Sequence, residues 1–361
     1  MPNLRFPEFS DEWRNYQIGD ILVVGNGRDY KDLIKGPIPV FGTGGYITSV
    51  NKYLYDGETV FIGRKGTINK PWYYNGKFWT VDTLFYTFKF KNCIPYFIFN
   101  IFQNINWLQY NEASGVPSLS KSTIERIEIS IPSIGEQAKI SELIKLVDKR
   151  IETQSKIIDK LQSLMSGICE RLLYYRTGEN VKLGDILYER VEKTTENNQY
   201  EILSSTVKGI FLQRDYFSKD IASENNIGYK VVRLNDIVLS PQNLWMGNIN
   251  FNDKFQIGSV SPSYKIFTIT DRFYKPFIAA ILKTHRALYN YELVSEQGAS
   301  IVRRNLNMEA FEQLAFKIPS YDRQVQIGTT ISTLRRRIDF TKNLYSALMQ
   351  QKQWLLQQMF I

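Results

Sequence analysis

The chain has 361 residues and a mass of 42.1 kDa, more than one ordinary hydrophobic core needs and suited to two domains. Hydrophobic residues make up 43% and aromatic residues 14% of the sequence, which excludes an intrinsically disordered chain. Forty-five Lys and Arg against 36 Asp and Glu give a formal charge of +9, with a basic surplus in both halves. This charge favours a polyanionic partner such as nucleic acid, although an ordinary basic surface would also account for it.

Two cysteines, Cys93 and Cys169, are too few for a disulfide framework, and no Cys/His cluster suits zinc. We therefore expect a reducing, cytoplasmic setting, no metal and no cofactor. The N-terminus lacks the apolar stretch of a signal peptide, and no apolar run reaches the roughly 18–20 residues of a membrane span. The single histidine, His285, argues against most histidine-based catalysis, and we expect it at the surface.

The chain contains an internal repeat. Residues 18–22 (Ile-Gly-Asp-Ile-Leu) recur as 183–187 (Leu-Gly-Asp-Ile-Leu), and a proline opens an apolar helical stretch at positions 95 and 276. Residues 119–133 match 306–320, both ending in Ile-Pro-Ser, and Gln137 matches Gln324 at the same offset. Four landmarks in the same order indicate a tandem duplication.

Short strands are expected in each repeat, at residues 59–62, 78–81 and 83–88 in the first and at 236–239 and 264–269 in the second. The Asn75-Gly76 pair predicts a hairpin turn. The glycine-rich residues 41–45 have the wrong spacing for a nucleotide-binding loop and are interpreted as a turn.

A heptad pattern of apolar residues follows each Ile-Pro-Ser. The strict 4,3,4,3 spacing predicts two long helices that pack antiparallel as a coiled coil, although two helices each packed on its own domain would explain an apolar stripe. The polar seam position Gln154 matches Thr341. The predicted seam consists of Ile144, Val147, Ile151, Gln154, Ile158, Leu161, Ile331, Leu334, Ile338, Thr341, Tyr345 and Leu348.

These patterns divide the chain into four segments. Residues 1–134 form a first strand-rich domain, 135–176 the first heptad helix, 177–321 a second domain and 322–361 the second heptad helix. Aperiodic residues near Gly178 indicate a linker.

Catalytic motifs are missing from the sequence. There is no Walker loop, no GxGxxG and no Pro-Asp nuclease signature, and residues 261–264 (Ser-Pro-Ser-Tyr) resemble a methyltransferase Asn-Pro-Pro-Tyr tetrapeptide but lack its second proline. We therefore predict a noncatalytic polypeptide with no catalytic residues.

Basic, amide and aromatic residues gather in corresponding loops of the two repeats. Arg and Lys bind guanine O6 and N7 or phosphate, whereas Gln and Asn match adenine N6 and N7. An ordinary exposed hairpin is the alternative interpretation. The predicted DNA-binding residues are Gly63, Arg64, Lys65, Gly66, Thr67, Asn69, Lys70, Tyr73, Tyr74 and Lys77 in the first repeat, and Ser240, Gln242, Asn243, Trp245, Asn248, Asn250, Arg303 and Arg304 in the second.

With these features assembled, the chain resembles the specificity subunit of type I restriction-modification enzymes. The resemblance rests on the opening residues 4–13, the repeated Gly-Asp-Ile-Leu, the Ile-Pro-Ser boundaries with Gln137 and Gln324, and the two heptad helices. It implies an α+β fold in which two mixed, strand-rich target-recognition domains form a tandem repeat separated by two long antiparallel coiled-coil helices.

The resemblance also implies a function. Each domain would read one half of a bipartite double-stranded DNA target, while the helices set the spacer and dock two modification (methyltransferase) subunits. Restriction subunits, the ATP-dependent translocase and nuclease, would join through the complex, and adenine methylation and cleavage would belong to these partners. The alternatives are a fused methyltransferase or nuclease and a coiled-coil adaptor without sequence-specific DNA readout.

Overall fold

The computed structural model describes residues 2–173, 178–216, 225–297 and 304–360. Helices and strands are mixed along the chain, which confirms the expected α+β class. The chain divides into two compact units, one of Met1–Lys156 with Asn343–Ile361 and one of Ile157–Lys342. None of the described helices has both the length and the apolar character needed to cross a membrane.

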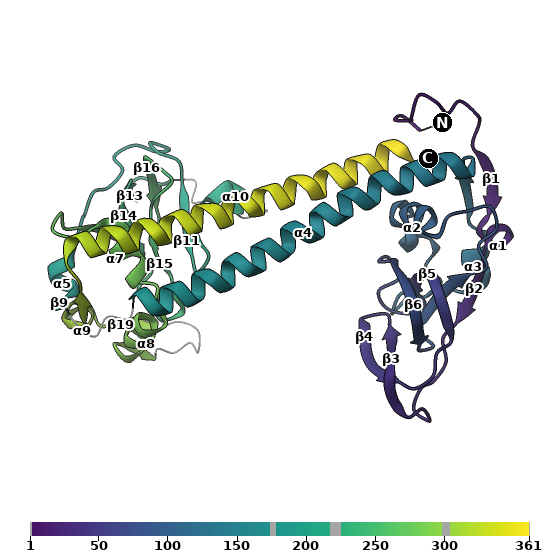
Figure 1. Cartoon of the computed structure of the whole chain (residues 1–361). Helices are drawn as coiled ribbons and strands as arrows, with labels where there is room; N and C mark the ends of the chain where they lie inside the picture. Colours follow the sequence, from purple (N-terminus) through teal and green to yellow (C-terminus); the bar gives the residue numbers. More distant parts are fainter. Residues whose placement is uncertain (1, 174–177, 217–224, 298–303, 361) are drawn as a thin grey trace. The chain divides into compact units, whose positions relative to one another are not determined.

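Unit 1 begins with a strand and a very short helix and continues into a sheet (Figure 1). Its elements are β1 (Arg14–Gln17), α1 (Ile18–Ile21), β2 (Val23–Asn26), β3 (Lys35–Gly42), β4 (Gly45–Val50), β5 (Tyr55–Gly63), β6 (Trp72–Thr80), β7 (Leu84–Phe88), α2 (Pro95–Asn104), the 3₁₀ turn η1 (Trp107–Tyr110), α3 (Lys121–Arg126), β8 (Glu128–Ile131) and the start of α4 (Ile134–Leu173).

The six-stranded sheet of unit 1 has the order β2-β7-β5-β6-β3-β4. Strand β5 is apolar on both faces because both are covered. Val60 and Ile62 lie in the core with Phe97 of α2, whereas Phe61 lies among aromatic residues on the other face, with ring centroids 4.8 Å from Phe78. This burial explains the continuous apolar run that predicted a strand at 59–62.

The prediction of a hairpin turn at Asn75-Gly76 is wrong. Both residues lie inside β6, where Asn75 pairs with Glu58 and Gly76 pairs with Gly57 of β5. Gly57 and Gly76 have φ values of +141° and +136°, which glycine tolerates and other residues rarely adopt. The Asn-Gly pair therefore marks a local irregularity of a long hairpin, and the β5–β6 connection is the loop at residues 64–71. The glycine-rich residues 41–45 do form the β3–β4 turn, in which Gly42 pairs with Gly45.

Unit 2 contains the following elements, in chain order: the end of α4, β9 (Glu179–Lys182), α5 (Leu183–Ile186), β10 (Leu187–Glu189), β11 (Leu203–Thr206), β12 (Gly209–Leu212), α6 (Gln213–Tyr216), β13 (Lys230–Arg233), β14 (Asp236–Leu239), the 3₁₀ turn η2 (Leu244–Met246), β15 (Ile249–Phe251), β16 (Ile257–Val260), β17 (Lys265–Ile269), α7 (Lys275–Ile281), α8 (His285–Leu293), β18 (Ser295–Gln297), β19 (Arg304–Leu306), α9 (Met308–Gln313), β20 (Ala315–Ile318) and most of α10 (Tyr321–Met359). His285, the first residue of α8, is exposed as expected.

The sheets of the two units correspond. The order β10-β17-β14-β15 in unit 2 repeats the order β2-β7-β5-β6 in unit 1. The chain order of these strands is also the same in both units, so β14 and β15 are the counterparts of β5 and β6. The duplication therefore extends beyond the matching sequence landmarks into the strand-rich regions.

The repeated Gly-Asp-Ile-Leu forms the short helices α1 and α5. In each unit this helix follows an edge strand and packs on the helix before the last strand, α3 or α9. A Cβ at Gly19 would lie 3.1 Å from Cβ of Glu125, and one at Gly184 would lie 3.3 Å from Cβ of Glu312. Glycine recurs at this position because it lets the two helices approach closely.

The long helices α4 and α10 begin directly after the two Ile-Pro-Ser boundaries, at Ile134 and Tyr321. In unit 1, Ile144 near the start of α4 shares a core with Leu355 near the end of α10, and Asp148 is 2.7 Å from the ammonium of Lys352. In unit 2, the end of α4 shares a core with Ile327 and Ile331 at the start of α10. Within each unit the two helices therefore run antiparallel.

Burial along α4 and α10 follows the heptad spacing. None of the predicted seam residues is exposed. Ile144, Val147, Ile331, Ile338, Thr341 and Leu348 are buried, while Ile151, Gln154, Ile158, Leu161, Leu334 and Tyr345 are half-buried. The predicted extension of the first helix to residue 176 lies outside the described residues.

Candidate nucleic-acid interface

The loop between β5 and β6 in unit 1, residues 64–71, is closed by glycines. A Cβ at Gly63 would lie 2.3 Å from the carbonyl oxygen of Thr67, so only glycine fits there. Gly66 has a φ of +86° and donates its N–H to the carbonyl of Pro117 at 2.8 Å. The side chains of Lys65, Thr67, Asn69 and Lys70 are exposed on this loop. The loop therefore presents cations and polar groups on a fixed backbone.

This loop is joined to the segment that precedes α3. Leu119 donates its N–H to the carbonyl of Arg64 at 2.9 Å, and Lys65 pairs with Ser118 in an isolated β-bridge. Two segments far apart in the sequence, residues 64–71 and 114–120, thus form one surface. We define this surface as the unit 1 loop site.

Arg64 lies at the base of the loop and is half-buried. Its guanidinium donates one hydrogen bond to the carbonyl of Asp82 at 3.3 Å, and its Cζ lies 5.8 Å from the centroid of the Phe85 ring. An arginine has five N–H donors, so this contact leaves most of them for a ligand.

Three predicted contacts of unit 1 lie elsewhere. Tyr73 is half-buried in the core, where its hydroxyl donates a hydrogen bond to Glu58. Burial raises the pKa of Tyr73, and the hydrogen bond to Glu58 raises it further. Tyr74 packs with its ring centroid 5.1 Å from that of Phe41. Lys77 is exposed, but it lies beyond Gly76 along β6 and is 4.0 Å from Asp56. Tyr73 and Tyr74 pack against the two hydrophobic clusters that cover the faces of the unit 1 sheet.

In unit 2 the loop between β14 and β15, residues 240–248, occupies the corresponding position. It is closed by hydrogen bonds from Ser240 N–H to Asn248 O and from Asn248 N–H to Asn243 O, at 2.9 and 3.2 Å. Arg304, in the segment that precedes α9, donates its N–H to the carbonyl of Gln242 at 3.1 Å. As with the bond from Leu119 N–H to Arg64 O in unit 1, the segment before the helix donates to the loop, and we define the surface formed here as the unit 2 loop site.

The amides of the unit 2 loop differ in their accessibility. Gln242 is exposed. Asn248 and Asn250 are 5% and 4% exposed, and their side chains bond to Ser205, with Asn248 Nδ2 3.0 Å from its carbonyl and Asn250 Nδ2 2.7 Å from its hydroxyl. These two asparagines are engaged inside the protein, because buried amides require partners. Asn243 differs, since its buried Oδ1 has no hydrogen-bond partner.

Arg304 stacks on Trp245, with Cζ 4.6 Å from the ring centroid, and forms an ion pair with Glu292 at 3.0 Å. Arg304 and Trp245 are half-buried. These contacts hold the two segments of the unit 2 loop site together. Arg303 lies outside the described residues.

A polar recess that the sequence did not predict borders this loop. Its volume is about 550 Å³, and hydroxyl and amide groups form much of its wall. Its lining includes Ser205, Tyr216, Tyr229, Asn243, Asn248, Ser261, Ser263 and Tyr264. The discounted residues 261–264 thus lie next to the predicted loop, and the proximity arises only when β11, β14 and β17 come together.

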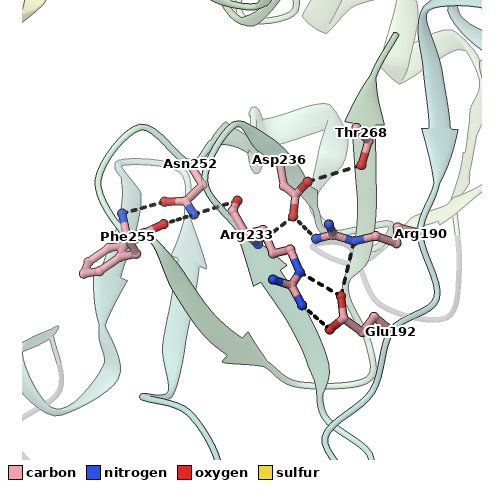
Figure 2. A network of polar contacts seen from close by, with 7 residues as sticks. All are labelled: Arg190, Glu192, Arg233, Asp236, Asn252, Phe255 and Thr268. Carbon is pink, nitrogen blue, oxygen red and sulfur yellow. Dashed lines mark hydrogen bonds and ion pairs between the residues drawn. The ribbon is translucent and has the colours of Figure 1, made fainter. Parts of the chain in front are cut away.

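A network of ion pairs holds the strands that carry the unit 2 loop (Figure 2). The carboxylate of Asp236, 2% exposed, accepts hydrogen bonds from the Arg190 guanidinium and from the Arg233 N–H, the latter at 2.6 Å. Burial raises the pKa of Asp236 in spite of these bonds. Arg233 also binds both carboxylate oxygens of Glu192, at 2.7 and 3.0 Å, which lowers the pKa of Glu192.

Asn252 extends this network beyond β15. Its side-chain amide donates to the carbonyls of Arg233 and Phe255, at 2.9 and 2.7 Å, and accepts from the Phe255 N–H (Figure 2). The network joins β13, β14 and the segment after β15, and thereby positions the loop between β14 and β15.

Comparisons with known proteins agree with this arrangement. Residues 10–163 match the family described as the type I restriction modification DNA specificity domain. The structure of a type I restriction-modification S subunit from M. genitalium is similar over 100% of this chain and 99% of that chain, with a TM-score of 0.69 and 14% sequence identity. A second structure, described under complex assembly and conformational transition of the type I R-M system, covers 97% of both chains with a TM-score of 0.52 and 13% identity.

These similarities confirm the predicted family and the predicted fold. Residues 10–163 carry the match to the type I restriction modification DNA specificity domain family, and the chain as a whole has the fold of a type I restriction-modification S subunit.

Proposed function

We propose that each unit reads one half of a bipartite double-stranded DNA target. The observation that carries this proposal is the correspondence between the two loop sites. Each loop connects corresponding strands and is joined by a backbone hydrogen bond to the segment before α3 or α9. Two equivalent surfaces with different side chains suit two half-sites of different sequence.

In the unit 1 loop site, Arg64 supplies donors for guanine O6 and N7, the most frequent specific contact of arginine in the major groove. Lys65 and Lys70 are exposed and contact phosphate, while Thr67 and Asn69 are placed to reach base edges.

In the unit 2 loop site, the exposed Gln242 matches adenine N6 and N7. The adjoining recess, which Asn243 also lines, offers hydroxyl groups to further base edges. Arg304 already has two partners, so its function is to support the loop.

The long helices dock two modification subunits and set the spacer between the half-sites. Large apolar side chains on them are exposed, with Phe340 at 67% and Trp354 at 52% on α10 and Leu146 at 56% on α4. Arg336 and Arg337 are exposed as well, whereas Arg335 lines a separate recess of unit 2. Adenine methylation, and ATP-dependent translocation and cleavage by restriction subunits, then belong to the partners of this chain.

A binding selection on random duplex DNA, made with the complex of this chain and modification subunits, tests the readout. We expect Arg64→Ala to relax one half-site by about 1–3 kcal/mol and Gln242→Ala to relax the other. Lys70→Ala should weaken all sequences together and lower the salt slope by about one, while Lys182→Ala, an exposed change on β9, should leave binding unchanged. If both loop variants alter the same half-site, or if neither alters any base preference, the assignment of the loops is wrong.

Co-purification tests the partners. Phe340→Asp and Trp354→Asp should each reduce recovery of modification subunits without changing the melting temperature of the isolated chain, because both side chains are largely exposed. Recovery of a single modification subunit per chain in an active methyltransferase would contradict the proposed two.

A further inference from the structure

A basic recess lies within unit 2, apart from the unit 2 loop. Its volume is about 460 Å³, within the range of about 300–1,000 Å³ typical of small-molecule sites. Five basic side chains line it: Lys208, Lys254, Lys283, Arg335 and Lys342. They come from the β11–β12 turn, the segment after β15, the segment after α7 and helix α10.

Basic side chains outnumber acidic ones in this recess. Two carboxylates, Asp253 and Asp339, also line it. Among the residues that the structure describes, none of the five cations is within 4.0 Å of a carboxylate, in contrast to the paired arginines of Figure 2. A cluster of unpaired cations around a concavity attracts an anion.

Lys283 is the innermost of these cations. It is half-buried, and its ammonium donates to the carbonyl of Val207 at 3.3 Å, which leaves two N–H groups for a ligand. Burial, together with the Arg335 guanidinium, lowers the pKa of Lys283 to about 8. An anion between Lys283 and Arg335 would relieve this repulsion.

The recess also has apolar walls. Ile338 of α10 is 7% exposed and Ala279 of α7 is 5% exposed, and both line it beside Met165 of α4. Low-polarity walls strengthen the attraction between charges because they exclude water. A single carboxylate would leave most of the positive charge unpaired, whereas an oligophosphate carries several charges and matches the arginine fork.

We propose that this basic recess binds a small phosphate anion with at least two phosphate groups, such as pyrophosphate or the phosphate chain of a nucleotide. Arg335 and Lys283 hold the anion from opposite elements, and the four lysines neutralise it. Lys208 also lines the polar recess beside the unit 2 loop, but Lys283 and Arg335 do not, so variants of these two residues test this proposal apart from the DNA readout.

Isothermal titration of the full chain with sodium pyrophosphate tests the site. We expect one binding site, weakened about 10-fold or more by Arg335→Gln and by Lys283→Gln, because each removes a charge-assisted hydrogen bond. The matched control is Lys182→Gln, an exposed lysine of unit 2 outside the recess, which should leave the affinity unchanged. Circular dichroism confirms folding, and Arg335→Gln is decisive if Lys283→Gln fails to fold, because Arg335 is exposed.

Two further titrations identify the source of the phosphate. ATP that displaces pyrophosphate in an Arg335-dependent manner would support a nucleotide, and pyrophosphate binding without ATP binding would support an inorganic anion. The proposal is overturned if wild-type protein binds neither, or if both variants bind with wild-type affinity. A DNA duplex that lacks the target sequence is a further probe. If this duplex binds in an Arg335-dependent manner and neither phosphate anion does, the proposal is overturned, because the recess would then be a DNA backbone contact.

Discussion

The side-chain carbonyl of Gln137 accepts a hydrogen bond from the backbone N–H of Ile94, at 2.9 Å, and so ties the start of α4 to the start of α2. Its amide donates to the carbonyl of Pro132 at 2.9 Å. In unit 2, Gln324 repeats both bonds, to the N–H of Tyr274 at 3.0 Å and to the carbonyl of Pro319 at 2.9 Å. The repeated glutamine thus satisfies an unpaired N–H at a helix start and locks the Ile-Pro-Ser boundary.

We expect Gln137→Leu and Gln324→Leu each to lower the free energy of unfolding by about 1–3 kcal/mol, because each leaves a backbone N–H and a carbonyl without its partner. Gln137 and Gln324 are 0% and 3% exposed. Chemical denaturation measures the effect. Gln353→Leu, at an exposed position of α10, is the control and should change stability by less than about 0.5 kcal/mol. Equal stability of all three variants would exclude the role of the repeated glutamine.

The seam residues differ in how deeply they are buried, so a charge introduced at different seam positions should destabilise the protein by different amounts. Ile144→Asp should destabilise the protein by several kcal/mol, because Ile144 is fully buried and an aspartate there has no partner. Ile158→Asp should cost less, because Ile158 is only half-buried, in contrast to the burial that the heptad pattern predicts. Thermal melting of both variants provides the comparison. A larger effect at Ile158 than at Ile144 would show that the heptad packing is wrongly assigned.

Two amides of the second loop should differ in the kind of defect that they cause. Asn248→Ala should lower the melting temperature, because it removes buried hydrogen bonds to Ser205. Gln242→Ala should leave the melting temperature unchanged and alter base preference, because its side chain is exposed. Melting curves and the DNA selection, made on the same preparations, separate the two effects. A stable Asn248→Ala protein with altered base preference would place Asn248 among the readout residues.

The lowered pKa of Lys283 predicts a pH dependence of stability. Between its folded pKa of about 8 and the ordinary value of 10.5, the unfolded chain binds more protons at this group, so its contribution to stability rises with pH. The difference in unfolding free energy between wild type and Lys283→Met should therefore shift in favour of wild type from pH 8 to pH 10.5. The other charged groups of the basic recess are present in both proteins and largely cancel. A difference that stays flat across this pH range would contradict the lowered pKa of Lys283.

Periodic patterns in the sequence predicted much of the frame. The 3.5-residue spacing indicated both long helices, because an apolar seam must face a partner along its whole length. The repeated Gly-Asp-Ile-Leu and Ile-Pro-Ser placed the duplication correctly, since each is needed for a local contact that recurs in both units, such as that of Gly19 with Glu125 and that of Gly184 with Glu312.

Local signals were misleading where a distant partner decides the conformation. Asn75-Gly76 is typical of a tight turn, but Gly57 of the neighbouring strand holds it inside a long hairpin. Tyr73 and Asn248 have side chains suited to DNA, yet Glu58 and Ser205 engage them inside the protein. Burial of this kind depends on which strands pair, and a single sequence does not record it.

The sequence by itself determined the duplicated frame, the helix seam and the positions of the two loops, because these follow from periodicity and from residues with restricted backbone conformations. Only the tertiary structure decided which loop side chains face outward, because exposure depends on neighbours far along the chain. It also created the polar recess beside Asn243 and the basic recess beside Lys283, whose walls come from strands and helices that the sequence separates widely. Charges brought together from several elements produce a local potential that no single segment carries.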